Sequence, residues 1–354
     1  MFNISRLFNG RKMRNGAMQA LPFWIASLIT GIVAVLYTRS FEWAEHLGIK
    51  ACKHYNWLIF VITPFSFLGA WLLVKRVDVY ARGSGIPQVM AAIELTKPGD
   101  DRYVKQLLNL RLLFVKVLSS LLMIFGGGAI GREGPTIQIA GIIFRKIDEW
   151  LPPWWPKVSR NNMILTGAAA GLAAAFNTPL GGIVFAVEEL ARSHISSFKT
   201  AIFTAVIIAG LTAQAFLGPY LYLGYPVIGH FAPYMLLTVI PVALVAGLSG
   251  SGMGLVILKV LDWKDGLQNK KAEALYVLGC ALLVATIAYS FSTNILGSGK
   301  SEMTNLLFTH QKQVAWQVPA SRIVGPVLSF TTGASGGIFA PSLAAGATIG
   351  SFVA

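Results

Sequence analysis

Charged residues are scarce in this chain of 354 residues, at 12%, against roughly a quarter in ordinary soluble domains. More than half of the residues, 55%, are hydrophobic. A soluble protein of this composition would have too little polar surface to present to water. The scarcity of charge therefore excludes an ordinary soluble domain and predicts an integral membrane protein.

Cysteine is also rare, since the chain has only Cys52 and Cys280, far apart in the sequence. This spacing excludes a disulfide framework and a cysteine-ligated metal site. The two residues are expected to be buried free thiols. We predict that the chain needs no metal and no cofactor and is not an enzyme.

Acidic residues are outnumbered, because 15 Asp and Glu face 29 Lys and Arg, which leaves a net charge of +14. Such an excess can indicate nucleic-acid binding, but here the basic residues lie mostly between apolar runs, as in loops near anionic lipid headgroups. The basic residues within 6–14 favour a cytoplasmic N-terminus. The segment after the first apolar run, with Arg39, Lys50 and Lys53, is also basic. We expect a loop there, which leaves the opposite orientation open.

Long uninterrupted apolar runs are few. The runs at 134–147, 163–175 and 179–190 are shorter than the roughly 20 helical residues that cross a bilayer, and Pro64 and Pro241 interrupt others. Short, broken helices are typical of transporters and channels, in which non-helical backbone lines a cavity. The polar linkers are too short for a soluble domain. We therefore predict one all-α polytopic membrane domain over residues 1–354.

Two glycine-rich stretches in distant parts of the chain resemble each other. "GAIGREGPTIQIAG" (128–141) and "GASGGIFAPSLAAG" (333–346) share Gly-Ala-x-Gly, a Pro, then Thr or Ser, and an apolar run that ends in Ala-Gly. Matching broken segments in two halves of a chain indicate a site between two repeats. We predict a first repeat over residues 20–190 and a second over residues 200–354. A chance likeness between Gly-rich apolar stretches is the alternative.

Three motifs share one plan, in which a Pro follows a Gly within five residues and an apolar run begins: "GSGIPQ" (83–88), "GREGPT" (131–136) and "GGIFAPS" (336–342). Pro suits the first turn of a helix, and Gly lets the backbone turn tightly. Three helix N-termini that converge in a bilayer can bind an anion without a full cationic side chain. Three turns that only pack helices are the alternative. The helix-start residues are Gly83, Pro87, Gly131, Gly134, Pro135, Gly337 and Pro341.

These motifs, together with "TGAAAGLAAAFNTPLGGIVFAVEE" (166–189), stand in the order seen in the CLC family of chloride channels and chloride/proton antiporters, which the chain resembles from about residue 20 to its end. The resemblance implies a CLC-type fold of broken, tilted helices with an inverted-topology repeat. It implies a homodimer in the lipid bilayer in which each subunit moves chloride and protons. The short N-terminal tail favours a bacterial inner membrane.

The resemblance also assigns an anion site. Ser84, in a motif with Gly85 and Ile86, matches the serine whose hydroxyl contacts the central anion, and Ser at this position goes with a preference for chloride. The backbone amides of Ile338 and Phe339 match the partners on the opposite side of that anion.

Two glutamates carry the predicted exchange. By resemblance, Glu133 is the gating glutamate, whose carboxylate occupies an anion position or swings away and takes up a proton. Glu189 matches the inner glutamate through which protons enter from the cytoplasm, while Lys116 and Arg132 match basic positions that set the field along the pathway. Two such glutamates favour antiport. A gated chloride channel is the alternative within the fold, and a non-transporting membrane scaffold is the alternative of another class.

The residues alone leave three alternatives open. An ionisable residue at membrane depth indicates function, but Glu133 could form a structural salt bridge with Arg132, although adjacent helical residues point apart. Glu188 and Glu189 could lie at a solvated helix end. Lys116 could be a structural buried cation.

Some features depart from expectation. The stretch "GSGKS" (297–301) looks like the end of a phosphate loop, but Asn294 stands where a Gly is required and no strand precedes it, which argues against nucleotide binding. Family antiporters often carry acidic residues after GSGIP, where this chain has Gln88 and Met90. The resemblance also implies further helices after Ala354, one with a tyrosine that contacts the anion, so we expect the sequence to be truncated.

Overall fold

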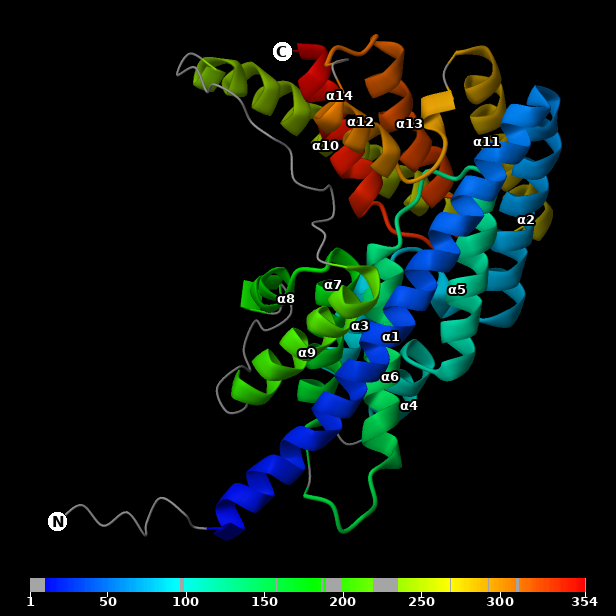
Figure 1. Ribbon diagram of the computed structural model, residues 1–354. Coiled ribbons are helices and arrows are strands. Elements are labelled where there is room, and N and C mark those ends of the chain that lie inside the picture. Colours follow the sequence, from blue (N-terminus) through cyan, green and yellow to red (C-terminus); the bar gives the residue numbers. More distant parts are fainter. Residues whose placement is uncertain are drawn as a thin grey trace. The chain divides into compact units, whose positions relative to one another are not determined.

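The chain is helical in the parts that the structure describes (Figure 1). The computed structural model describes residues 10–95, 99–156, 158–185, 187–188, 199–218, 235–267, 269–291, 293–309 and 312–353. The α-helices are α1 (Gly10–His54), α2 (Ile59–Val77), α3 (Ile86–Glu94), α4 (Asp101–Leu107), α5 (Leu110–Phe125), α6 (Glu133–Trp150), α7 (Arg160–Phe176), α8 (Pro179–Phe185), α9 (Lys199–Leu217), α10 (Met235–Asp265), α11 (Lys270–Ser290), α12 (Lys300–Phe308), α13 (Gln317–Phe330) and α14 (Phe339–Val353).

Six helical segments in the described part are long and apolar enough to cross a membrane. Between them lie helices that are too short to span, among them α3, α8 and α12. This mixture of long and short apolar helices agrees with the prediction of an all-α, multi-pass membrane protein. The six candidate spans are Met18–Cys52, Asn56–Val77, Asp101–Phe125, Thr200–Leu217, Leu237–Asp265 and Lys270–Ser290.

The first membrane helix is longer than its apolar run predicted. α1 spans 45 residues, which is well beyond the roughly 20 that cross the hydrocarbon. Arg39 and Lys50, expected in a loop, lie on this helix. Hydropathy alone underestimates the length of α1, because the second half of the helix contains polar residues. Many residues in that half have high helix propensity, so the helix continues beyond the apolar run.

One compact unit consists of Met1–Leu36, Ile86–Leu113 and Thr136–Pro219. Its core joins Phe23 of α1, Phe144 of α6 and Met163 of α7, all fully buried. Gly171 on α7 faces α6 so closely that a Cβ there would lie 2.6 Å from the Cβ of Ala140. Small residues thus let the helices approach, which is how helices pack in lipid.

The motif "FNTPLGG" makes a sharp helix break in this unit. α7 ends at Asn177, which has a φ of 55° in the left-handed region and donates its N–H to the carbonyl of Ala173. Asn tolerates this conformation better than most residues. Pro179 then opens α8, where its missing N–H costs nothing.

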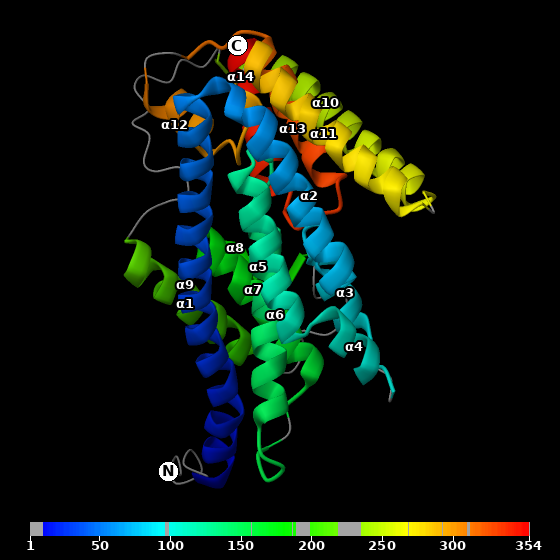
Figure 2. The ribbon, with the colours of Figure 1, turned by 90° about the vertical axis from the view of Figure 1, so that its right-hand side faces the viewer.

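The second compact unit consists of Tyr37–Gly85, Phe114–Pro135 and Tyr220–Ala354. Within it, α2 and α11 lie side by side and antiparallel (Figure 2). Lys75 near the end of α2 pairs with Glu273 in the first turn of α11 at 2.8 Å. At the opposite end of the pair, Phe60 meets Tyr289 edge to face, with ring centroids 5.5 Å apart.

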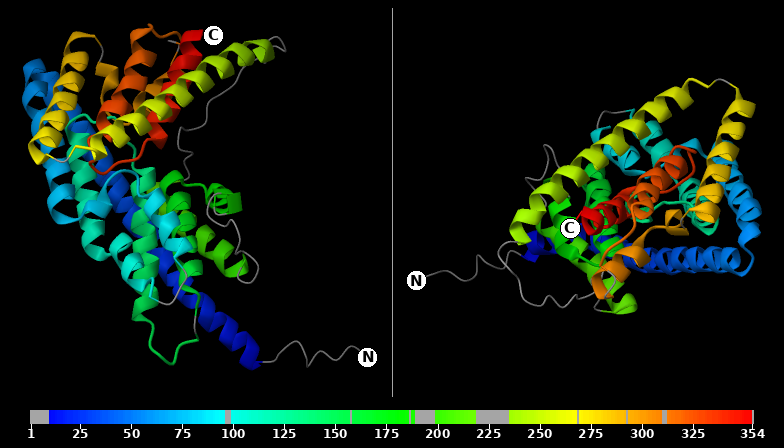
Figure 3. Two further views of the ribbon diagram at one scale, coloured as in Figure 1. Left: turned by 180° about the vertical axis from the view of Figure 1, so that it is seen from behind. Right: turned by 90° about the horizontal axis from the view of Figure 1, so that it is seen from above.

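The third glycine motif belongs to the second unit and lies where the link from α13 runs into α14. α10 packs along α14 and also contacts α13 (Figure 3). Residues 331–338 link α13 to α14, and Gly333 in this link has a φ of 82°, which favours Gly. The division into units does not test the predicted single domain or its repeats over 20–190 and 200–354, which stay predictions.

Candidate functional site

The first and third glycine motifs are joined by main-chain hydrogen bonds within the second unit. The Gly83 N–H donates to the carbonyl of Ala334 at 3.0 Å, and the Gly336 N–H donates to the carbonyl of Gly83 at 3.1 Å. The backbone at Gly83 has a φ of 64° and that at Gly85 a φ of 93°. Only Gly adopts such values readily, so the backbone conformation explains why glycines stand at these two positions.

The second and third motifs are joined in the same way. The Gly131 N–H donates to the carbonyl of Gly337 at 2.7 Å, and the Gly337 N–H donates back to the carbonyl of Gly131 at 2.8 Å. A Cβ at Gly134 would lie 2.7 Å from the Cβ of Ser84, which brings the first motif against the second. The three motifs therefore meet in one place.

Some of the residues that were predicted to bind the anion lie around this junction. Ser84 is half-buried and Gly85 buried, and both belong to the second unit. Ile338 precedes α14, whose first residue is Phe339, so both stand at a helix N-terminus as predicted. Ile86 and Pro87 open α3 and Pro341 lies in the first turn of α14, so Pro marks both helix starts, but α3 belongs to the first unit.

Glu133 is the first residue of α6 and is only 2% exposed. Its carboxylate folds back toward Gly131, because a Cβ on Gly131 would lie 2.3 Å from Glu133 Oε2. Pro135 follows within the same first turn. A buried carboxylate beside a helix N-terminus is stabilised by the N–H groups and dipole there, which also stabilise free anions.

Replacing Gly131 by Ala tests the space that Glu133 occupies. The new methyl group would displace the carboxylate, since the end of a side chain moves more easily than backbone. A shift of about 1 kcal/mol changes the population of the buried carboxylate about fivefold. If Glu133 is the gating glutamate that the resemblance implies, Gly131→Ala should fold and should lower proton movement per chloride about twofold or more in reconstituted vesicles. Gly279→Ala on α11, where a Cβ meets nothing within 4 Å, is the control. Equal proton-to-chloride ratios in both variants would contradict this placement of Glu133.

Lys116 on α5 is completely buried. Its Nζ donates to the carbonyl of Ala81 and to that of Gly83, both at 2.9 Å. The cation thus binds the loop that carries Ser84 through backbone oxygens. This contact supports the structural alternative for Lys116, and its predicted influence on the anion stays open.

Arg132, 3% exposed, forms an ion pair that the sequence did not predict. It donates to Glu42 Oε1 on α1 at 3.0 Å and to the carbonyl of Thr38 at 3.4 Å. Lys300 at the start of α12 donates to the same Glu42 oxygen at 3.0 Å. Glu42 therefore holds two cations next to Glu133.

Two more buried cations bind loop carbonyls and were missed in the sequence. Lys264 of α10 donates to the carbonyls of Thr331 and Thr332, in the link that carries the third motif. Arg322 of α13, 1% exposed, donates to the carbonyl of Gly297 at 3.0 Å. A rule that examines every ionisable residue at membrane depth, rather than those in motifs alone, would have selected both.

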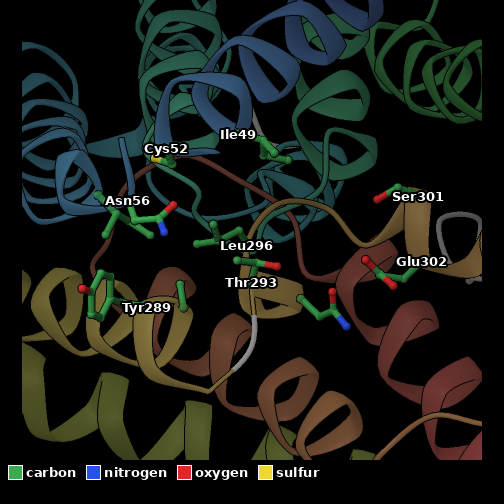
Figure 4. A pocket seen from close by; sticks show the side chains of 11 residues that line it. Ile49, Cys52, Asn56, Tyr289, Thr293, Leu296, Ser301 and Glu302 are labelled. Atoms are coloured by element: carbon green, nitrogen blue, oxygen red, sulfur yellow. The ribbon is translucent and has the colours of Figure 1, made fainter. Parts of the chain in front are cut away.

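The second unit contains cavities, and one of them lies beside the Glu133 carboxylate and its neighbouring cations. This cavity, of about 10 Å³, is lined by Glu133 and Arg132 together with Glu42 and Lys300, and is about large enough for one water. Another cavity, of about 220 Å³, contains none of the predicted site residues (Figure 4). Its lining includes Asn56, Tyr289, Thr293, Ser301 and Glu302.

A cavity of about 70 Å³ lies where the link to the third motif meets α2 and α10. It is lined by Gly333, Lys264 and Arg82, among others. Arg82 pairs with Asp265 at 3.0 Å. The Glu133 cavity thus lies beside the second motif, and this cavity lies beside the link to the third motif. Both cavities are lined by basic side chains.

Glu189 lies outside the described residues, and its predicted role in proton entry stays a prediction. Its neighbour Glu188 is exposed. The stretch "GSGKS" contacts α1 instead of a nucleotide-binding strand and helix. Ser298 donates its main-chain N–H to Glu45 at 2.6 Å, and Lys300 pairs with Glu42.

Residues 66–354 match the family described as voltage gated chloride channel. The H(+)/Cl(-) exchange transporter ClcA of Salmonella arizonae is 27% identical over 347 aligned residues, which cover 92% of this chain and 69% of that protein. The ClcA of Salmonella typhi has the same identity and coverage.

Two solved structures share the fold. A slow cyanobacterial Cl⁻/H⁺ antiporter superposes with a TM-score of 0.74 at 24% identity, covering 92% of this chain and 76% of its own. A CLC-type fluoride/proton antiporter superposes with a TM-score of 0.73 at 19% identity, covering 93% of this chain and 78% of its own.

Proposed function

Because the chain belongs to the voltage-gated chloride channel family, a family of membrane transport proteins and not of enzymes, we propose that it exchanges chloride for protons across a membrane. The CLC fold and the multi-pass membrane class follow from the family and fold matches. Its bacterial relatives indicate the plasma membrane.

The observation that carries this proposal is the position of Glu133. Its side chain is buried at the start of α6, beside the point where the three glycine motifs meet. A carboxylate in such a place can occupy the position of an anion, or take a proton and leave it. It therefore links movement of an anion to movement of a proton.

The anion passes the junction of the motifs in this proposal. The Ser84 hydroxyl binds chloride from one side, in the loop Gly83–Gly85, and the N–H groups of Ile338 and Phe339 bind it from the other. The first N–H groups of a helix have no partner within the helix, and the helix dipole adds positive potential there. Chloride is thus held without a cation in direct contact, which keeps its binding weak enough for release.

Proton coupling needs a second site that is reached from the other side of the membrane. We propose Glu189 for this role, with protons passing between it and Glu133 while chloride moves in the opposite direction. The relatives named as exchange transporters support antiport over passive conduction. We also propose a homodimer with one pathway in each subunit.

Two other functions stay possible outcomes. A gated chloride channel would use the same Glu133 without coupled protons. The fold match to a fluoride/proton antiporter makes fluoride the second candidate anion, whereas Ser84 favours chloride by its resemblance to the family's serine.

Reconstitution of the full chain into liposomes tests the proposal. With a chloride gradient, and potassium and valinomycin to set the voltage, we expect chloride movement and an opposed, chloride-dependent movement of protons. Vesicles without protein are the control. Chloride flux without proton movement would identify a channel. Transport of fluoride but not of chloride would show that fluoride is the substrate.

A further inference from the structure

An ion-pair cluster borders the Glu133 cavity on the side of α1. Glu42 Oε1 accepts from Arg132 and from Lys300, both at 3.0 Å. We call these three residues the Glu42 cluster. The Arg132 side chain is 4% exposed and that of Lys300 28%, whereas the Glu42 side chain is 43% exposed. The carboxylate therefore has more contact with solvent than the two cations that it joins.

The position of Lys300 is fixed by a scaffold of its own. Glu45, one turn after Glu42 on α1, accepts the main-chain N–H of Ser298 at 2.6 Å and its hydroxyl at 3.0 Å. Gly297 has a φ of 74°, and a Cβ there would lie 2.3 Å from Glu45 Oε1. Arg322 holds the carbonyl of Gly297 at 3.0 Å. The loop before α12 is thus tied to α1 without help from Glu42.

Arg132 is placed independently as well. It follows Gly131, whose main-chain bonds with Gly337 fix the backbone, and it also donates to the carbonyl of Thr38. If Glu42 turned toward solvent, the two cations would lose the carboxylate that they share and would both face the small cavity beside Glu133. Two cations that each lie 3.0 Å from one carboxylate oxygen repel each other unless an anion lies between them.

From this arrangement we propose that Arg132 and Lys300 form a docking site for a small monovalent anion, and that the Glu42 carboxylate competes with the transported anion for it. The proposal rests on the function proposed above and adds a step before the anion reaches the place of Glu133. With the predicted cytoplasmic N-terminus, the end of α1 that carries Glu42 faces the outside. Glu42 thereby sets how much external chloride is needed to fill the site.

The chain contains a matched arrangement away from the cavity. Glu149 on α6 pairs with Arg145 and Lys146, and its side chain is 33% exposed. It is again one carboxylate between an arginine and a lysine. Glu149 belongs to the first unit and lines neither the Glu133 cavity nor the motif junction. Glu149→Gln therefore removes the same kind of interaction without touching the proposed site.

The experiment measures chloride uptake by full-chain protein in liposomes as a function of chloride concentration. Removing a half-exposed competing charge changes affinity by roughly twofold to fivefold. We expect Glu42→Gln to lower the apparent KM for chloride by that factor and Lys300→Gln to raise it by a similar one. The double variant should return near the wild-type value, while Glu149→Gln should leave the apparent KM unchanged.

A merely structural role predicts a different pattern. In that case Glu42→Gln and Lys300→Gln would both lower the maximal rate and the thermal midpoint in detergent, with no opposite shifts in KM. An unchanged KM in Glu42→Gln, or shifts of both variants in the same direction, would overturn the docking site. Absence of chloride uptake by the wild-type chain would instead refute the proposed function, which separates the two failures.

Discussion

Replacing Glu133 by Ala is expected to abolish proton coupling and to leave chloride movement intact. The side chain is buried at the start of α6, in the space above Gly131. Without the carboxylate, the start of α6 loses its proton carrier and the tethered anion that competes with chloride. Loss of a positioned proton carrier slows transfer by about a hundredfold or more. Simultaneous recording of chloride and pH in vesicles measures both effects.

Companion variants separate the charge from the space. Glu133→Asp keeps an acid on a shorter side chain and should retain part of the coupling. Glu189→Gln leaves Glu133 in place and should remove proton movement but spare chloride movement. If opposed proton movement persisted in Glu133→Ala at the wild-type ratio, the gate would have to be another residue.

Replacing Lys116 by Met is expected to have the largest effect on stability among the site residues. The substitution leaves the buried carbonyls of Ala81 and Gly83 without their cationic donor. Burying a lysine is itself costly, so part of the loss is offset. The net loss of unfolding free energy should be about 2 kcal/mol, as is typical for losing hydrogen bonds from a charged donor. The two carbonyls keep one other donor each, Ser335 Oγ for Ala81 and the Gly336 N–H for Gly83. The maximal chloride rate should fall as well, because the loop that Lys116 binds also carries Ser84.

Thermal unfolding in detergent and chloride uptake together decide between the two interpretations of Lys116. A structural cation predicts that Lys116→Met unfolds several degrees earlier, while Lys116→Arg, which keeps the charge, recovers part of the loss. A cation that acts only through its field predicts the reverse. The thermal midpoint would then stay at the wild-type value, and only the apparent KM for chloride would rise.

Sequence reasoning succeeded where a short stretch of chain carries its own signal. Gly83 and Gly85 predicted tight backbone positions, and Pro135 and Pro341 predicted helix starts that the structure has. It failed where the signal lies in propensity beyond the apolar run. Arg39 was expected in a loop because charge suggests solvent, yet it lies on α1.

The ion-pair partners in the site were not predictable in the same way. Glu42, Arg132 and Lys300 are far apart in the chain, and no local pattern relates them. The spacing of Glu42 and Glu45, three residues apart in an apolar helix, was the available signal, since both face one side. It would have marked a polar face on α1 without naming its partners.

The sequence by itself determined the membrane class, the helical character, the family and the place of each glycine motif. These follow from composition and from short-range backbone chemistry, because the cost of exposing apolar residues or of a left-handed turn is set locally. Only the tertiary structure decided that the three motifs meet, that Lys116 binds the loop of Ser84 and that Glu42 joins two cations beside Glu133. Such contacts depend on which helices pack together, and buried charges take whatever partner that packing brings within reach.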